Sequence, residues 1–306
     1  MKVLIIGYGS VAEKHHEALL RLDPAVEVVA LRSKYTAKAI EKVDSVYTYN
    51  EAKTQAPYTF AIISNPTFKH TEAIEQLLSL NCPLFIEKPL SDNLKCGTLV
   101  EELLSAKVIT YVACNLRFLD SLVYLKEKLL KDLVVNEVNV YCGSFLPDWR
   151  PGLDFRNIYS SDAKRGGGVH LDLIHELDYV YWLFGKPVSV RSFKSTASSL
   201  GISAIDYANY LLGYNTFSVN IILNYFRKDK KRQIELVCSD DTYTIDLLSN
   251  SITNNSEIVF RSKQTIRDTY FIQMEYFIDL VVKERNQGKM MNDIHEAYEV
   301  LKICLK

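Results

Sequence analysis

The sequence lacks a long hydrophobic run and a strong charge of either sign. No stretch approaches the roughly 18–20 apolar residues that a membrane-spanning helix needs. The 306 residues carry 36 Lys and Arg against 37 Asp and Glu, a formal net charge of −1. This balance offers no basic field for nucleic acid, and no Lys/Arg-rich amphipathic stretch indicates a membrane surface. We therefore expect neither a nucleic-acid partner nor a membrane partner.

Paired cysteines are also missing. The six cysteines are scattered without a CxxC pair, and no His/Cys/Asp cluster has metal-ligand spacing. The pattern predicts reduced, mostly buried thiols, no metal site and a cytoplasmic location. The apolar run before Gly7 is too short for a signal-peptide core, so we interpret it as a buried strand.

The first third of the chain alternates short apolar segments with amphipathic ones. Continuous apolar strands between helices indicate a parallel sheet that is covered on both faces. A hydrophobic content of 48% over this length suits two domains with separate cores. We predict a first domain over residues 1–116, with strands at 3–6, 26–31, 60–64, 84–86 and 108–114 and helices at 11–22, 70–80 and 93–105.

After residue 116 the pattern changes to longer extended segments with period-two alternation, which is typical of an antiparallel sheet. We predict for residues 117–306 an α+β domain, an open and mostly antiparallel sheet with helices on one face. Its last helix can pack back on the first domain. The expected elements are a helix at 119–131, a strand at 134–145, one helix from the triple glycine to Gly185, hairpins within 209–225 and 234–247, and helices near 265–286 and 293–305.

A glycine-rich loop stands between the first strand and the first helix. It reads Gly7-Tyr8-Gly9-Ser10-Val11-Ala12, a GxGxxA run. Gly7 allows a tight turn, Gly9 lets the backbone approach a pyrophosphate, and Ala12 allows close helix–strand packing. The helix N-terminus offers its N–H groups to phosphate. The loop predicts dinucleotide binding; the alternative is a glycine turn without a ligand. His15 and His16, in the helix that follows, are expected to face solvent.

The end of the second strand bears on the choice of cofactor. An acidic residue there binds the ribose 2′-hydroxyl of NAD, but the sequence reads Leu31-Arg32-Ser33-Lys34. Arg32 could stack on adenine and pair with a 2′-phosphate, and Ser33 could donate a hydrogen bond to that phosphate. We expect NADP to be preferred over NAD. The alternative is a solvated turn in an enzyme that accepts both.

Three side chains that are far apart in the sequence suit acid–base chemistry. Lys88 ends a parallel strand, where open α/β sheets place their ligands, and could stabilise negative charge on a substrate oxygen. Asp172 and His175 follow the triple glycine, and on one helix their spacing puts them on one face. His175 can take a proton from a hydroxyl as hydride leaves its carbon, and Asp172 can orient the imidazole or bind substrate. Together with the glycine loop, these residues predict hydride transfer at a carbon that bears oxygen.

Five motifs resemble those of the glucose–fructose oxidoreductase, inositol dehydrogenase and rhizopine-catabolism (Gfo/Idh/MocA) oxidoreductases, over almost the whole chain. Two departures are the order Asn-Pro, where the family has Thr-Pro-Asn, and the two residues between Asp172 and His175, where many members have three. The motifs are the Gly7 to Ala12 loop, Ser64-Asn65-Pro66-Thr67 with His70, Glu87-Lys88-Pro89-Leu90, Asn115-Leu116-Arg117-Phe118 and Gly166-Gly167-Gly168 with Asp172.

The resemblance implies an NAD(P)-dependent dehydrogenase or reductase that acts on a sugar or a nucleotide-sugar, with Lys88, Asp172 and His175 as the catalytic residues. It implies a Rossmann domain, a nicotinamide at the cleft between the domains, and a sheet face that often builds a homodimer or homotetramer. Two alternatives remain: an NAD-dependent glycoside-cleaving enzyme of the same fold, and a non-catalytic nucleotide-sensing regulator. The Gly7 to Ala12 loop, Arg32 and Ser33 are the first candidate cofactor contacts. The resemblance adds Ser64, Asn65, Pro66, His70, Glu87, Lys88 and Asn115.

Arginine and tryptophan side chains around the triple glycine are candidates for substrate contact, beside Lys88, Asp172 and His175. Guanidinium groups suit phosphates, and an indole suits the face of a sugar ring. The alternative is an ordinary polar loop rim. The candidates are Arg117, Trp149, Arg150 and Arg165, with Arg156 and Tyr159 nearby.

Overall fold

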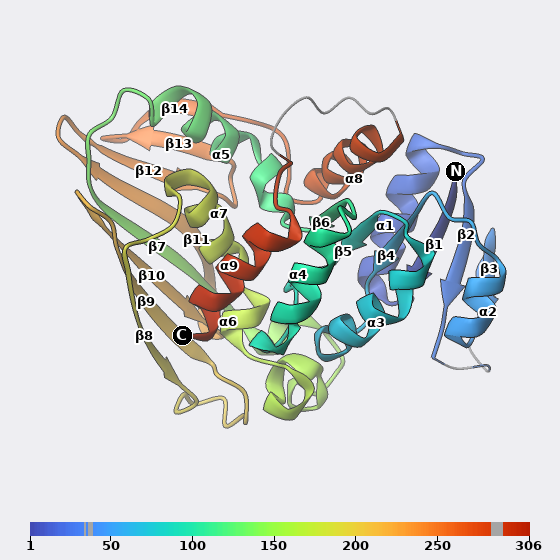
Figure 1. Cartoon of the computed structure of the whole chain (residues 1–306). Coiled ribbons are helices and arrows are strands. Elements are labelled where there is room, and N and C mark those ends of the chain that lie inside the picture. Colours follow the sequence, from blue (N-terminus) through green and yellow to red (C-terminus); the bar gives the residue numbers. More distant parts are fainter. Residues whose placement is uncertain (34, 36–38, 283–289) are drawn as a thin grey trace. The chain divides into compact units, whose positions relative to one another are not determined.

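The computed structural model describes residues 1–33, 35, 39–282 and 290–306. The chain divides into two compact units, each built on its own sheet (Figure 1). The first unit comprises Met1–Cys114 and Tyr270–Leu301, and the second comprises Asn115–Thr269 and Lys302–Lys306. The C-terminal helices therefore contribute mainly to the first unit.

The described part of the first unit holds a six-stranded parallel sheet in the order β3-β2-β1-β4-β5-β6. The order reverses between β1 and β4, the switch point at which open α/β sheets bind ligands. β1 and β4 are buried almost throughout, which explains their continuous apolar sequence. The strands are β1 (Lys2–Ile6), β2 (Glu27–Leu31), β3 (Val43–Val46), β4 (Phe60–Ile63), β5 (Leu84–Ile86) and β6 (Thr110–Val112).

The helices of this unit follow the predicted alternation. The sequence pattern missed β3 and α2, because in β3 only Val46 is buried and the short edge strand has no apolar run. The expected end of the helix near residue 286 lies outside the described residues. The helices are α1 (Ser10–Leu22), α2 (Tyr49–Thr54), α3 (His70–Leu77), α4 (Gly97–Ser105), α8 (Asp268–Val282) and α9 (Ile294–Leu305), the last two shared with the second unit at one end.

The second unit confirms the open, mostly antiparallel sheet. Its described strands number eight, in the order β14-β13-β12-β11-β7-β10-β9-β8, and only the β7–β10 pairing among them is parallel. Both predicted hairpins are present, β9–β10 and β11–β12. The strands are β7 (Val135–Phe145), β8 (Ser189–Ser195), β9 (Tyr207–Gly213), β10 (Ser218–Asn224), β11 (Phe226–Cys238), β12 (Thr242–Asp246), β13 (Ser251–Asn254) and β14 (Glu257–Arg261).

One face of this sheet is covered by short helices (Figure 1). In β10, Val219, Ile221 and Leu223 are fully buried, as the alternation predicts. The covering helices are α5 (Asp120–Tyr124), extended by a π-helical turn, α6 (Val169–Asp172) and α7 (His175–Phe184). All six cysteines are buried, as expected. Within the described residues, no helix has the length and apolar character that crossing a membrane requires.

Candidate active site

The predicted nucleotide loop turns sharply between β1 and α1. Gly7 has φ +81°, and a Cβ there would lie 2.7 Å from the Cα of Asn65, so only glycine fits. The Ser64 hydroxyl donates to the Gly7 carbonyl at 2.9 Å and ties the loop to the end of β4. Ala12 is fully buried where α1 meets the sheet. The turn at Gly7 and the packing at Ala12 are as predicted.

The residues around Gly9 fit a dinucleotide. Gly9 is the N-cap of α1 and has no side chain that could cap the helix. A Cβ at Gly9 would meet no described atom within 4 Å, which leaves room for a phosphate beside the backbone. Asn65 adds a buried amide oxygen, Oδ1, that has no hydrogen-bond partner among the described residues. The N–H groups of the first helical turn suit the negative charge of a pyrophosphate.

We expect Gly7→Ala and Gly9→Ala to fail in different ways. Alanine at position 7 must adopt a positive φ and displace Asn65, so the free energy of unfolding should fall by about 1–3 kcal/mol. Alanine at position 9 fits the fold, but its methyl group occupies the approach to the pyrophosphate. The dissociation constant for NADH should then rise at least about tenfold, which equals about 1.4 kcal/mol. Urea denaturation and nicotinamide fluorescence measure the two effects. Unaltered NADH binding by folded Gly9→Ala would contradict the assignment of the loop.

Arg32 and Ser33 follow β2 beside the loop. Arg32 is half-buried, and its Nη1 donates to the Ser45 hydroxyl of β3 at 3.4 Å. The Gly7 N–H donates to the Leu31 carbonyl at 2.9 Å, so Arg32, the next residue, lies near the loop. Burial raises the pKa of Tyr8 to about 12, and the charge of Arg32 opposes that shift. Ser33 is exposed. Lys34, the next residue of this turn, lies outside the described residues.

His15 and His16 were expected to face solvent, but both lie on the buried side of α1. His15 is 0% exposed, and its Nε2 lies 2.6 Å from Oε1 of Glu87. His16 Nδ1 lies 2.6 Å from the Tyr8 hydroxyl. One nitrogen of each imidazole thus has a polar partner, whereas His15 Nδ1 and His16 Nε2 are buried without one among the described residues. The sequence pattern missed these partners because Glu87 is 72 residues away from His15.

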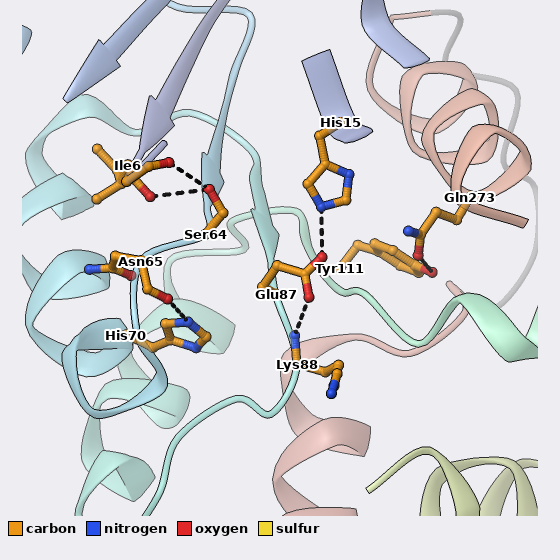
Figure 2. Close-up of polar contacts among 10 residues, drawn as sticks. Ile6, His15, Ser64, Asn65, His70, Glu87, Lys88, Tyr111 and Gln273 are labelled. Atoms are coloured by element: carbon orange, nitrogen blue, oxygen red, sulfur yellow. Dashed lines mark hydrogen bonds and ion pairs between the residues drawn. The ribbon is translucent and has the colours of Figure 1, made fainter. Parts of the chain in front are cut away.

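Lys88 lies in the turn that follows β5 (Figure 2). Because β1, β4 and β5 are parallel neighbours, Gly7, Asn65 and Lys88 share the carboxyl edge of the sheet. The Lys88 side chain is half-buried, and its backbone N–H donates to Oε2 of Glu87 at 3.2 Å. The Lys88–Pro89 peptide is cis. The structure thus brings the dinucleotide loop, the Asn65 segment and Lys88 to one edge, as the strand order predicts.

The single helix expected after the triple glycine is two helices, which corrects the interpretation of Asp172 and His175. Asp172 ends α6 and His175 begins α7, with Leu173 at φ −102° and ψ 30° between them. The two residues between the helices are Leu173 and Ile174. Neither is a helix-breaking Gly or Pro, so the sequence gives no sign of the break. The one-face argument for a continuous helix therefore does not apply.

The triple glycine permits a close approach of two backbone segments. A Cβ at Gly167 would collide with the carbonyl oxygen of Tyr159, and Gly168 has φ +143°. The glycines therefore let the start of α6 lie directly against the segment that carries Tyr159.

Asp172 is held by two tyrosines, and sequence reasoning found neither contact. Oδ1 accepts a hydrogen bond from the Tyr159 hydroxyl at 2.6 Å, and Oδ2 accepts one from the Tyr225 hydroxyl at 2.5 Å. Burial and the negative charge of Asp172 raise the pKa of both tyrosines, which keeps them protonated as donors. The ring of Trp149 packs edge-on against Tyr225 at 5.3 Å. Tyr225 continues the buried alternation of β10, which was the only available signal.

The structure places Arg117, an expected substrate contact, in a buried ion pair. Its Nε and Nη2 donate to the two carboxylate oxygens of Asp178 at 2.9 and 2.7 Å, and the side chain is 1% exposed. This edge of the guanidinium is committed to a buried ion pair. The sequence could not show this pair, because its two residues are 61 positions apart.

The remaining candidates are spread over the second unit. Trp149 donates from Nε1 to the Ser144 hydroxyl at 2.9 Å. Arg150 and Arg165 are exposed, and Arg165 donates to the Asn157 carbonyl at 3.2 Å. Asn115 is buried and donates to the Thr269 hydroxyl at 2.7 Å. Across the described residues, no group of His, Cys, Asp and Glu could hold a metal ion.

Comparison with known proteins identifies both parts of the chain. Residues 1–113 match the family profile described as "Oxidoreductase family, NAD-binding Rossmann fold", and residues 127–244 match the GFO/IDH/MocA C-terminal domain. An uncharacterized oxidoreductase, sll0816, from Synechocystis is 26% identical over 64% of this chain and 55% of its own. The uncharacterized oxidoreductase YdgJ from Escherichia coli is 24% identical over 70% and 62%. The alignments thus span less than two thirds of either relative.

Solved structures share the fold at low sequence identity. UDP-N-acetylglucosamine 3-dehydrogenase from Acidithiobacillus ferrooxidans has a TM-score of 0.78 at 18% identity, covering 100% of this chain and 95% of that one. An oxidoreductase from Thermotoga maritima has a TM-score of 0.84 at 19% identity, with coverage of 100% and 96%. The WlbA dehydrogenase from Bordetella pertussis has a TM-score of 0.79 at 15% identity, with coverage of 98% and 92%. Because the family profiles match both the N-terminal and the C-terminal part, the chain belongs to the Gfo/Idh/MocA oxidoreductase family.

Proposed function

We propose that the protein is an NAD(P)-dependent dehydrogenase or reductase that exchanges hydride between nicotinamide and a hydroxyl- or keto-bearing carbon of a sugar. The observation that carries the proposal is the carboxyl edge of the first sheet. There the open dinucleotide loop after β1 and Lys88 after β5 flank the Asn65 segment after β4. The family match supports the nucleotide part of this assignment.

The bound dinucleotide supplies the hydride chemistry. Lys88 donates a hydrogen bond to the substrate oxygen and stabilises negative charge there. His175 exchanges the hydroxyl proton, and Asp172 binds the substrate or orients His175. Asp172 is fixed for this task by Tyr159 and Tyr225. Lys88 belongs to the first unit and the other two to the second, so their assignment to one reaction rests on the shared family motifs.

A nucleotide-sugar is the substrate class that we propose. Structures of the same fold include a UDP-N-acetylglucosamine 3-dehydrogenase, WlbA in complex with NADH and UDP-GlcNAcA, and a myo-inositol 2-dehydrogenase. The exposed guanidinium groups of Arg150 and Arg165 suit a diphosphate, and the indole of Trp149 suits a sugar ring. We also propose assembly as a homodimer or homotetramer through the open face of the eight-stranded sheet.

The direct test is turnover of UDP-sugars with NADP and NAD, followed by nicotinamide absorbance and by product analysis. Accumulation of reduced cofactor with an oxidised sugar supports a dehydrogenase. Release of a leaving group without net reduction of cofactor would favour the glycoside-cleaving alternative. Cofactor binding without turnover of any tested sugar would favour the non-catalytic regulator.

We expect the purified protein to bind NADPH more tightly than NADH, by about tenfold to a hundredfold, through charge-assisted contacts of Arg32 with the 2′-phosphate. Arg32→Asp should reverse this preference, because it replaces the cation with a carboxylate suited to the ribose hydroxyls. Lys95→Asp, an exposed position on the same unit, makes the same change in net charge and serves as the control. Fluorescence titration measures all three proteins. NADH-favoured binding in the wild type would contradict the NADP proposal.

A further inference from the structure

Two buried histidines contact the turn that contains Lys88, one from each side along the chain. Figure 2 shows the first side, where His15 lies against Glu87 and Glu87 against the Lys88 N–H. His15 contacts Glu87, the residue before Lys88, and His70 contacts Pro89, the residue after it. All of these residues belong to the first unit. Sequence reasoning placed His15 in solvent and treated His70 only as a cofactor contact.

On the first side, the Glu87 carboxylate joins His15 to the backbone of Lys88. Oε1 lies 2.6 Å from His15 Nε2, and Oε2 accepts the Lys88 N–H at 3.2 Å. The His15 ring also packs edge-on against Phe85 at 4.9 Å, so the imidazole is fixed in direction. Burial alone would raise the pKa of Glu87, but His15, with the charges of Lys88 and His70, holds that pKa below its usual range. Glu87 is therefore a carboxylate acceptor for both donors.

On the second side, His70 joins Pro89 to the segment after β4. Its Nδ1 lies 2.9 Å from the Pro89 carbonyl, and its Nε2 lies 2.9 Å from the Asn65 carbonyl. The ring is 1% exposed. Burial lowers the pKa of His70, while the two carbonyls and Glu87 favour its protonated form. Both partners are acceptors, so the protonated imidazole donates to both carbonyls and the neutral ring donates to one of them. The two carbonyls belong to segments that follow the neighbouring strands β4 and β5.

Both histidines lead back to the dinucleotide loop. His15 lies on α1, which begins directly after Gly9, so the helix connects the loop rigidly to Glu87. The Asn65 carbonyl that faces His70 belongs to the residue after Ser64, whose hydroxyl donates to Gly7. Two short chains of contacts thus run from the loop to the two neighbours of Lys88. A buried His–Glu pair is weak evidence for stability alone, since apolar residues fill a core as well.

We propose that His15 and His70 are positioning residues for Lys88. His15 acts through Glu87 and His70 acts through the Pro89 carbonyl. The proposal rests on the proposed function only for the reaction that Lys88 serves. The contacts that carry it are properties of the first unit by itself.

The test compares His15→Leu with His15→Gln. Leucine fills space without a donor, whereas glutamine keeps an N–H that can reach Glu87. Hydrogen exchange of the Lys88 amide, measured by NMR, should speed up at least about tenfold in His15→Leu and stay near the wild-type rate in His15→Gln. The amide of Ile86, two residues before Lys88 and at the end of β5, is the internal control. In assays with a nucleotide-sugar that the protein turns over, kcat should fall by about 10²-fold in His15→Leu, because a small misplacement of a catalytic group costs that much. The NAD(P)H dissociation constant should be unchanged.

His70→Leu provides a second, independent arm through the Pro89 carbonyl, and Glu87→Gln keeps the shape of the junction if His15→Leu does not fold. Glutamine at position 87 has one acceptor oxygen for two donors, so Lys88 exchange should again rise. Equal loss of kcat in the leucine and glutamine variants of His15, or Lys88 exchange at the wild-type rate in His15→Leu, would overturn the proposal. If no sugar is turned over, the exchange arm alone decides the positioning claim, while the absence of turnover counts against the proposed function.

Discussion

Arg117→Met should destabilise the second unit by about 3–5 kcal/mol, because it leaves the Asp178 carboxylate buried without its partner. Asp178 is 1% exposed, and its two oxygens accept from Nε and Nη2 of Arg117. Water cannot replace those donors at such a site, so the desolvation cost of the carboxylate is uncompensated. This outcome separates a structural ion pair from the substrate contact that the sequence predicted.

Tryptophan fluorescence in urea measures the effect, because both tryptophans of the chain, Trp149 and Trp182, lie in the second unit. The Trp182 ring is 5.9 Å from the Arg117 guanidinium, close enough to report on its removal. The double variant Arg117→Met/Asp178→Leu should recover much of the loss, since an apolar pair of similar volume is often neutral. Arg117→Lys should be intermediate, because an ammonium group cannot bond both oxygens in the same fork. A normal unfolding midpoint with a raised KM for the sugar would restore the substrate-contact interpretation.

His175→Asn should lower kcat for the proposed reaction by about 10²–10⁴-fold, the second large effect that we expect. Asparagine keeps a polar group of similar size but cannot exchange a proton near neutral pH. The dissociation constant for NAD(P)H should stay within about twofold, since His175 is not among the proposed dinucleotide contacts, which apart from Asn115 belong to the other unit. Single-turnover absorbance measurements separate the hydride step from product release.

His170→Asn is the matched control for His175→Asn. His170 lies on α6, five residues earlier, and is also buried. Burial lowers the pKa of His170 to about 4, and the Lys194 charge acts in the same direction, so it is a poor proton acceptor near pH 7. We expect kcat of His170→Asn to remain within about fivefold of wild type. A larger loss in His170→Asn than in His175→Asn would exchange the roles of the two histidines.

Several features of the site followed from short stretches of sequence. The glycine loop could be placed because Gly7 has the positive φ of a tight turn, and the flanking strand and helix have clear hydrophobic periods. Lys88 could be placed at the carboxyl edge because it directly follows an apolar strand of a parallel sheet. The assignment of Lys88, Asp172 and His175 to catalysis stays a prediction.

The break between Asp172 and His175 shows where local reasoning stops. Residues 169–184 have helical composition throughout, and no glycine or proline marks the interruption. Asp172 is instead bonded to Tyr159 and Tyr225, 13 and 53 residues away. The break thus lies beside contacts that no window of neighbouring residues contains.

The sequence by itself determined the fold class, the alternation of the first sheet, the two hairpins of the second and the position of the dinucleotide loop. Only the tertiary structure decided the partners of its buried charges: His15 with Glu87, Arg117 with Asp178, and Asp172 with its two tyrosines. The physical reason is range. Hydrophobic periodicity and turn chemistry act between residues a few positions apart, so they can be recognised from the sequence alone. A buried charge needs a hydrogen-bond partner wherever the folded chain supplies one, and that choice exists only in three dimensions.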